Sequence, residues 1–182
     1  MPTMTMQVGV VLEKRKARSQ WLDVIWEAHG LLAEPPDAAT GAPLGSNGDG
    51  ELFYGGAATL EAHTVGTPYY RDNISTGQPR IWVVLRPPDG DELPEIVKVT
   101  CDPTEGEGYT ETGWNTVNIV PMPEPILAAL MVFIDEHHID QPYIKRKRDR
   151  VDPEALAFGA KGPERDRILR ELREKAGNHE PS

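Results

Sequence analysis

The chain has 182 residues, a formal net charge of -10 and a hydrophobic content of 38%. This length accommodates one domain with extensions, and the negative charge opposes general binding to nucleic acid or to anionic membranes. The single cysteine, Cys101, excludes an internal disulfide and a multi-cysteine metal site. No apolar run is long enough to span a bilayer, and residues 1–16 lack the pattern of a secretory signal. We therefore expect a cytoplasmic protein without direct membrane insertion.

The N-terminal quarter predicts strands separated by turns. Residues 6–12 are β-branched and apolar, as in a strand, and residues 13–18 should form a charged, exposed turn. The spacing in residues 21–32 fits a helix or a strand, and we favour a strand because glycine and proline end it early. Residues 34–50 are small and polar, which predicts a surface loop.

The middle of the chain predicts further strands. Residues 51–64 hold two short runs around a glycine pair, and residues 69–74 should be extended. Residues 80–86 form the clearest strand, and residues 96–100 return as its partner after an Asp-Gly hairpin signal. A loop and a last strand at residues 114–120 should follow. Because the connections are short, we expect antiparallel pairing.

Residues 121–143 carry the strongest helix signal of the chain. Every residue from 126 to 134 is apolar, which predicts a helix buried on more than one side. We place this central helix at residues 123–138. The sequence therefore predicts an α+β fold, in which an antiparallel β-sheet or partly closed barrel packs on one long apolar helix.

The C-terminal part differs in character from the rest. We expect a β-rich domain at residues 1–153 and an extension at residues 154–182 with a short helix at 163–176. Such a helix is marginal alone and gains stability by docking. The basic strip at residues 145–148, which precedes this extension, is either a contact for an acidic partner or a solvated segment balanced by carboxylates elsewhere. The candidate partner-binding residues are Lys145, Arg146, Lys147, Arg148, Ile168, Leu169 and Leu172.

The end of the central helix holds the side chains most typical of metal chemistry. Asp135 and His138 would share a helix face, next to His137, and could both contact a metal. A third ligand would have to come from elsewhere, for example His63 or Asp102. Histidines are also favoured at a helix C-terminus by its partial negative charge. We prefer this structural interpretation and expect no metal.

The cysteine, three arginines and the tryptophans are further candidates for reactive or binding residues. Cys101 is followed by Asp102, which disfavours a reactive thiolate, so a small buried thiol is the better interpretation. Arg71, Arg80 and Arg86 are candidate ligand-binding residues for a phosphate group, if folding brings them together. The four tryptophans, among them one or two possible interface anchors, are otherwise expected in the core or on a sheet face.

Three stretches of the chain resemble one known family. They are residues 8–21 (VGVVLEKRKARSQW), 79–86 (PRIWVVLR) and 120–148 (VPMPEPILAALMVFIDEHHIDQPYIKRKR). The family is proteobacterial, is catalogued only as a domain of unknown function, and is often encoded beside molybdenum formate dehydrogenases. The resemblance covers roughly the first four-fifths of the chain. It implies an accessory or assembly role in a formate dehydrogenase system.

Members of this family are sometimes labelled molybdopterin-guanine dinucleotide biosynthesis protein A. That label implies a nucleotidyltransferase with a glycine-rich phosphate loop after its first strand, whereas residues 8–21 lead into charged residues and tryptophan. We therefore expect a non-catalytic protein without a cofactor, which contacts a formate dehydrogenase subunit or maturation factor. Two alternatives stay open: a binder or enzyme for a phosphate-bearing pterin or nucleotide, and a small constitutive subunit of a larger oxidoreductase complex.

Overall fold

The computed structural model describes residues 1–18, 23–48, 50–88, 90, 92–111 and 113–138, and residues 166, 167, 170 and 171. Contacts group Met1–Ile139 into one compact unit. The strands described in it are β1 (Thr3–Lys16), β2 (Val24–Leu32), β3 (Pro43–Asn47), β4 (Gly50–His63), β5 (Arg80–Arg86), β6 (Glu95–Thr100) and β7 (Thr116–Pro121). Its described helices are the 3-10 helix η1 (Thr64–Gly66), α1 (Thr67–Ser75), α2 (Pro103–Gly108) and α3 (Glu124–His137).

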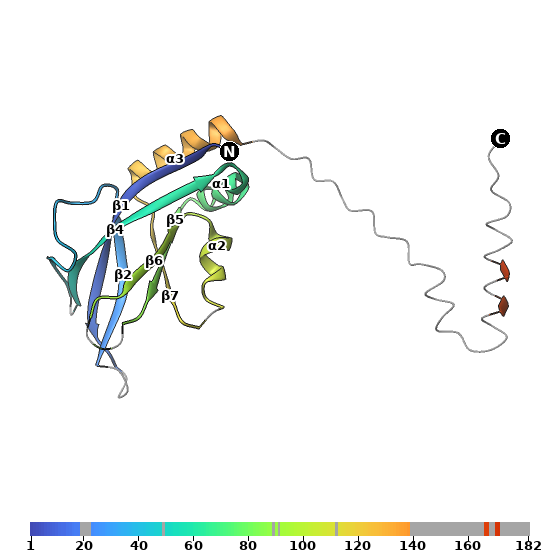
Figure 1. The fold of residues 1–182 in the computed structure, drawn as a ribbon. Coiled ribbons are helices and arrows are strands. Elements are labelled where there is room, and N and C mark those ends of the chain that lie inside the picture. Colours follow the sequence, from blue (N-terminus) through green and yellow to red (C-terminus); the bar gives the residue numbers. More distant parts are fainter. Residues whose placement is uncertain are drawn as a thin grey trace. The chain divides into compact units, whose positions relative to one another are not determined.

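The strands form one mixed sheet that curves into a nearly closed barrel (Figure 1). Its order is β2-β1-β4-β6-β5-β7, and β3 pairs with the first residues of β4. Every pair is antiparallel except β4 and β6, which run parallel where Leu60 faces Val99. The exception arises because α1 and β5 form a crossover between these two strands. The partly closed barrel was predicted correctly, and purely antiparallel pairing was wrong at this one pair.

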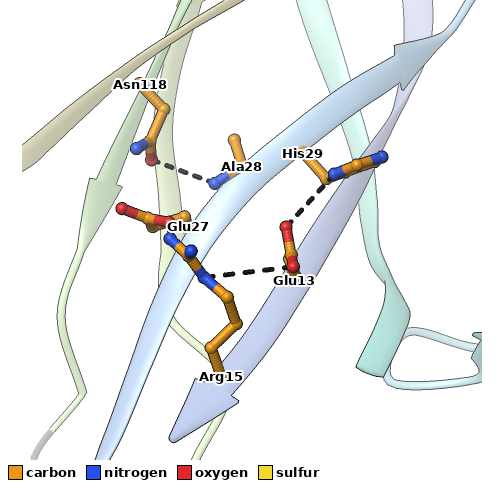
Figure 2. A network of polar contacts seen from close by, with 6 residues as sticks. All are labelled: Glu13, Arg15, Glu27, Ala28, His29 and Asn118. Carbon is orange, nitrogen blue, oxygen red and sulfur yellow. Dashed lines mark hydrogen bonds and ion pairs between the residues drawn. The ribbon is translucent and has the colours of Figure 1, made fainter. Parts of the chain in front are cut away.

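The remaining seam of the barrel, between the edge strands β2 and β7, is bridged by a side chain. Oδ1 of Asn118 in β7 accepts a hydrogen bond from the main-chain N–H of Ala28 in β2, at 3.0 Å (Figure 2). In an antiparallel ladder, alternate residues of a strand bond to the same neighbouring strand. The Asp23 carbonyl accepts from the Ala17 N–H at 3.0 Å, so the odd-numbered residues of this part of β2 bond to β1. The N–H of the even-numbered Ala28 therefore points away from β1. The amide side chain thus satisfies an edge donor that no ladder reaches.

Helix α3 shares the core of this unit through one face. Ile126, Leu130 and Phe133 recur at helical spacing and are buried in the same cluster as the inward side chains of the strands. On the opposite face, Met131 and Val132 are 53% and 58% exposed. The prediction of burial on more than one side is therefore wrong, because an unbroken apolar run does not reveal which face a helix buries. Fully buried strand residues in the core include Val8, Val10, Leu12, Leu60, Ile81, Val83 and Val99.

Two predicted non-helical segments are helices. Residues 69–74 lie in α1, in whose first turn Pro68 stands, where its missing N–H leaves no bond unmade. Residues 103–108 form α2 within a predicted loop. Asp102 caps this helix, since its carboxylate accepts from the Thr104 and Glu105 N–H groups at 2.8 and 3.3 Å. Both helices are short, and a proline in the first turn of α1 and the Asp102 cap of α2 define them better than apolar periodicity.

Three strands differ from the prediction. Residues 13–16 continue β1 instead of forming an exposed turn, and the predicted loop 34–50 contains β3. The two runs predicted in residues 51–64 are one strand, β4. A β-bulge separates them, with a register shift opposite Val10 and Val11 and with Gly56 at a φ of 120°. Glycine adopts this φ readily, so the bulge bends β4 without ending it.

The second unit, residues 140–182, is described at only four positions. These residues are helical, and Arg167 Nε lies 3.8 Å from Glu171 Oε1, one helical turn away. The basic strip at 145–148 and the predicted apolar side of the terminal helix, Ile168, Leu169 and Leu172, lie outside the described residues. Across the described ranges, none of the helices has the length and hydropathy of a bilayer span.

Replacing Asn118 with alanine should lower the free energy of unfolding by about 1–3 kcal/mol, because the Ala28 N–H would lose its acceptor at the seam. Urea denaturation measures this loss. Gln7→Ala is the control, since the Gln7 amide donates to the Thr59 hydroxyl at 2.8 Å on an exposed surface; it should change stability by less than about 0.5 kcal/mol. Equal effects of the two substitutions would contradict a special role for the seam bond.

Candidate functional site

A pocket of about 770 Å³ opens at the seam, between the first half of β2 and the segments that end β5 and begin β7. Its volume lies in the range of pockets that hold ligands or side chains of a partner. Val24, Ile25 and Trp26 of β2 form one wall. Leu85 and Thr116, neighbours on the paired strands β5 and β7, contribute to the other. We refer to this cavity as the seam pocket.

The local sequence explains why the barrel is open at this point. Pro87 and Pro88 directly follow β5 and line the pocket, and Pro94 lines it from just before β6. Proline has no N–H to donate to a ladder, so this wall cannot pair with the edge of β2. The bond between Asn118 and Ala28 closes the seam one residue beyond the last β2 residue of the pocket.

Trp26 is the largest side chain of the pocket wall. Its ring meets Phe53 edge to face with centroids 5.5 Å apart, and Lys14 Nζ lies 5.4 Å from the ring centroid. The indole Nε1 is buried and has no hydrogen-bond partner among the described residues. A buried N–H without an acceptor costs free energy.

A polar network joins side chains of β1 and β2 (Figure 2), and its member Glu27 lines the pocket. Arg15 forms an ion pair with Glu27, which lines the pocket, and its Nε lies 3.9 Å from Glu13 Oε1. Oε2 of Glu13 is 3.2 Å from Nδ1 of His29. The Glu13 side chain is only 12% exposed, and a side chain at Gly50 would collide with its carboxylate. The network holds the Glu27 carboxylate in place at the pocket.

Among the described residues, the two charged side chains that line the seam pocket are both acidic. Glu27 is paired with Arg15, whereas the exposed Asp23 has no ion pair within the described ranges. The remaining described wall residues are apolar, except for the hydroxyl of Thr116 and the indole N–H of Trp26. The pocket thus combines apolar walls with a negatively charged side and a buried donor.

The predicted metal-ligating histidines have separate neighbours. His138 caps α3, with Nδ1 3.0 Å from Thr67 Oγ1 and Nε2 in contact with the Arg71 guanidinium. His137 packs edge to face against Phe133, with centroids 4.9 Å apart. Asp135 is exposed on α3. In the part of the chain that the structure describes, no three His, Cys, Asp or Glu side chains group as metal ligands do.

The two residues considered as a third ligand also have other contacts. His63 Nδ1 lies 3.2 Å from Thr3 Oγ1, at the paired ends of β1 and β4. Asp102 caps α2. Each of these side chains therefore contributes to the local structure of its own element.

The three candidate arginines do not converge. Arg80 and Arg86 stand at opposite ends of β5, about 20 Å apart at the rise of a strand. Arg80 donates to Gln78 Oε1 at 3.0 Å, and Arg86 pairs with Glu95 at 2.7 Å. Arg71 contacts His138 on α3. Their positions give no common phosphate site.

Cys101 is a buried thiol, as predicted. Burial, together with the nearby carboxylates of Asp102 and Glu105, raises its pKa to about 12. The Asn73 side chain holds the surrounding backbone: its amide nitrogen donates to the carbonyls of Cys101 at 2.9 Å and Arg80 at 2.8 Å. This environment stabilises the protonated thiol and disfavours nucleophilic chemistry.

Sequence reasoning did not find the seam pocket. Its described walls come from residues 23–27, from five residues between Leu85 and Pro94, and from Thr116, which only the strand order brings together. A local signal was present in Pro87 and Pro88, which end β5 and cannot pair with the edge of β2 beside them. The position of the β2 edge opposite them could not be read from the chain.

The fold and the seam pocket define a small protein with a nearly closed, barrel-like sheet and a cavity at the barrel seam. Residues 7–148 match the family model "Protein of unknown function (DUF3305)", so the chain belongs to this family. The match confirms the predicted membership in a domain of unknown function and includes every described residue of the pocket. No curated protein and no solved structure matches the chain significantly.

Titration of Cys101 should make the fold less stable at high pH. Its pKa rises from an ordinary 9.0 to about 12 on folding, so the unfolded chain loses the proton first and the free energy of unfolding falls between pH 9 and 12. Between pH 9 and 10 this thiol should account for a loss of about 1 kcal/mol, measured by urea denaturation. Cys101→Val removes the thiol at similar volume and should lack this component. An unchanged pH dependence in the variant would refute the assignment.

Proposed function

We propose that this chain is a non-catalytic accessory or assembly protein that holds a protein partner at the seam pocket. The observation that carries the proposal is the open edge of β2 beside an apolar, proline-walled cavity. Clefts that combine apolar walls with a few polar groups are preferred binding sites. The open strand edge adds main-chain donors and acceptors, which a polypeptide partner can use.

Charge and geometry favour a protein over a phosphate-bearing pterin or nucleotide. The charged residues that line the pocket, Asp23 and Glu27, are acidic, and a phosphate group would meet repulsion there. Arg71, Arg80 and Arg86 are dispersed over α1 and the two ends of β5. A partner with apolar and basic side chains suits the pocket better.

The partner that we propose is a subunit or maturation factor of a molybdenum formate dehydrogenase, met in the cytoplasm. The resemblance of residues 8–21, 79–86 and 120–148 to a family encoded beside such enzymes supports this choice. In this proposal, the buried face of α3, with Ile126, Leu130 and Phe133, packs against the sheet and supports the strands that carry the pocket. The basic strip at 145–148 and residues Ile168, Leu169 and Leu172 provide further contacts with the partner.

Thr116→Arg tests the proposal, because Thr116 is exposed at the start of β7 and lines the pocket. An arginine there would fill the cavity without removing a buried side chain. The tagged chain is recovered from native lysate, and formate dehydrogenase subunits and maturation factors are quantified by mass spectrometry. We expect the wild type to recover such a protein and Thr116→Arg to lose at least about 90% of it.

Thr5→Arg is the matched control. Thr5 is an exposed residue of β1 outside the pocket, so this variant adds the same charge and should recover the partner at the wild-type level. Equal recovery by both variants would contradict binding at the pocket, and recovery of no formate dehydrogenase component would contradict the proposed partner. A fixed stoichiometry through every purification step would instead identify a constitutive subunit.

A further inference from the structure

We infer that the seam pocket binds an extended peptide segment, which adds to β2 as a further strand and places a basic residue beside Asp23 and Glu27. This inference rests on the proposed protein-binding function and specifies how the partner binds. Three features of the described residues carry it: the direction of the β2 main-chain groups, the shape and composition of the opposite wall, and the charge of the pocket.

The main chain of β2 presents a free edge to the pocket. β1 and β2 pair in continuous register from Leu12 and Ala28 to Lys16 and Val24. The Asp23 carbonyl accepts from Ala17 of the β1 side, while the Ala28 N–H points to β7. Odd-numbered residues of this stretch therefore face β1, and the N–H and C=O groups of Val24 and Trp26 face the pocket.

The opposite wall leaves room for a strand but cannot act as one. Its described residues are Leu85, Gly90 and the prolines Pro87, Pro88 and Pro94, with Thr116 at the beginning of β7. The prolines offer apolar surface and no N–H, so the Val24 and Trp26 main-chain groups find no ladder partner on this wall. An inserted segment would form hydrogen bonds with β2 on one side and place apolar side chains against the prolines on the other.

The charge of the pocket selects among extended segments. Asp23 and Glu27 flank the stretch that contains Val24 and Trp26, so a lysine or arginine of the segment can reach a carboxylate at either end of that stretch. Acidic segments would meet repulsion. The pocket volume of about 770 Å³ suits a few residues rather than a folded surface. The expected ligand is thus a short extended segment with apolar residues and at least one basic residue.

A display library of random heptapeptides, panned on the full chain, provides the probe. We expect enrichment of peptides in which a basic residue accompanies apolar residues at alternate positions, since alternate side chains of a strand share one face. Thr116→Arg, which fills the pocket, should abolish their binding. Failure to enrich any peptide that Thr116→Arg loses would overturn the inference, and so would enrichment of acidic peptides.

Val24→Pro against Val24→Ala tests the strand addition itself. Both variants lose the valine side chain, but only proline removes the N–H that faces the pocket, and proline is tolerated where a strand N–H is not used by the ladder. An enriched peptide should bind Val24→Pro about tenfold more weakly than Val24→Ala, measured by fluorescence anisotropy. Methylation of the peptide nitrogens that face β2 should weaken binding to the wild type by a similar factor, independently of how Val24→Pro folds.

The outcomes separate the binding mode from the proposed function. If peptides lose affinity for Thr116→Arg but tolerate both Val24→Pro and backbone methylation, the pocket binds protein and strand addition is wrong. If a native partner is lost with Thr116→Arg while no peptide binds, the proposed function stands and the short-segment inference fails. If neither peptides nor a native partner depend on Thr116, both fail.

Discussion

The hydrogen bond from the Ala28 N–H to Asn118 Oδ1 is the constraint on which the rest of this structure depends. It joins residues 90 positions apart in the sequence and stands at the seam where β2 and β7 are not linked by a ladder. A barrel abolishes its exposed edges only where it is closed. This bond closes the seam at Ala28, and the pocket lies beside the preceding stretch of β2, where prolines form the opposite wall.

The position of the pocket follows from a register shift in β2 and from the prolines that end β5. A register shift between β1 and β2 occurs beside Ala28, next to the His29 side chain that contacts Glu13. Pro87 and Pro88 end β5 opposite the residues before Ala28. Bulges and prolines are known devices for managing strand edges. Here they leave the edge of β2 open beside apolar walls.

The sequence predicted the elements that have a clear period of their own. β5 and α3 show continuous apolar runs, β6 and β7 show β-branched residues around one polar residue, and the structure has all four near the predicted positions. It did not predict α1 and α2, whose identity rests on Pro68 and on the Asp102 cap rather than on periodicity. The parallel pairing of β4 with β6 is a property of the strand order, which short-range patterns do not encode.

The candidate site was less predictable than the fold for the same reason. The residues singled out for chemistry, such as Cys101 and His138, have the side chains that reactions require, yet their surroundings bury or engage them. The seam pocket is lined by common residue types, mostly apolar with two carboxylates, and only the unpaired strand edge beside them marks the position as a site. Its one unusual group, the buried Trp26 N–H, is defined by what surrounds it and not by residue type.

Hydrogen exchange of individual β2 amides tests the central claim most directly. The account predicts that, in the free protein under native conditions, the Ala28 amide exchanges slowly because Asn118 accepts its hydrogen bond, while the Val24 and Trp26 amides exchange much faster because their N–H groups face the open pocket. Equal protection of the three amides would contradict an edge that is closed at Ala28 and open beside the pocket.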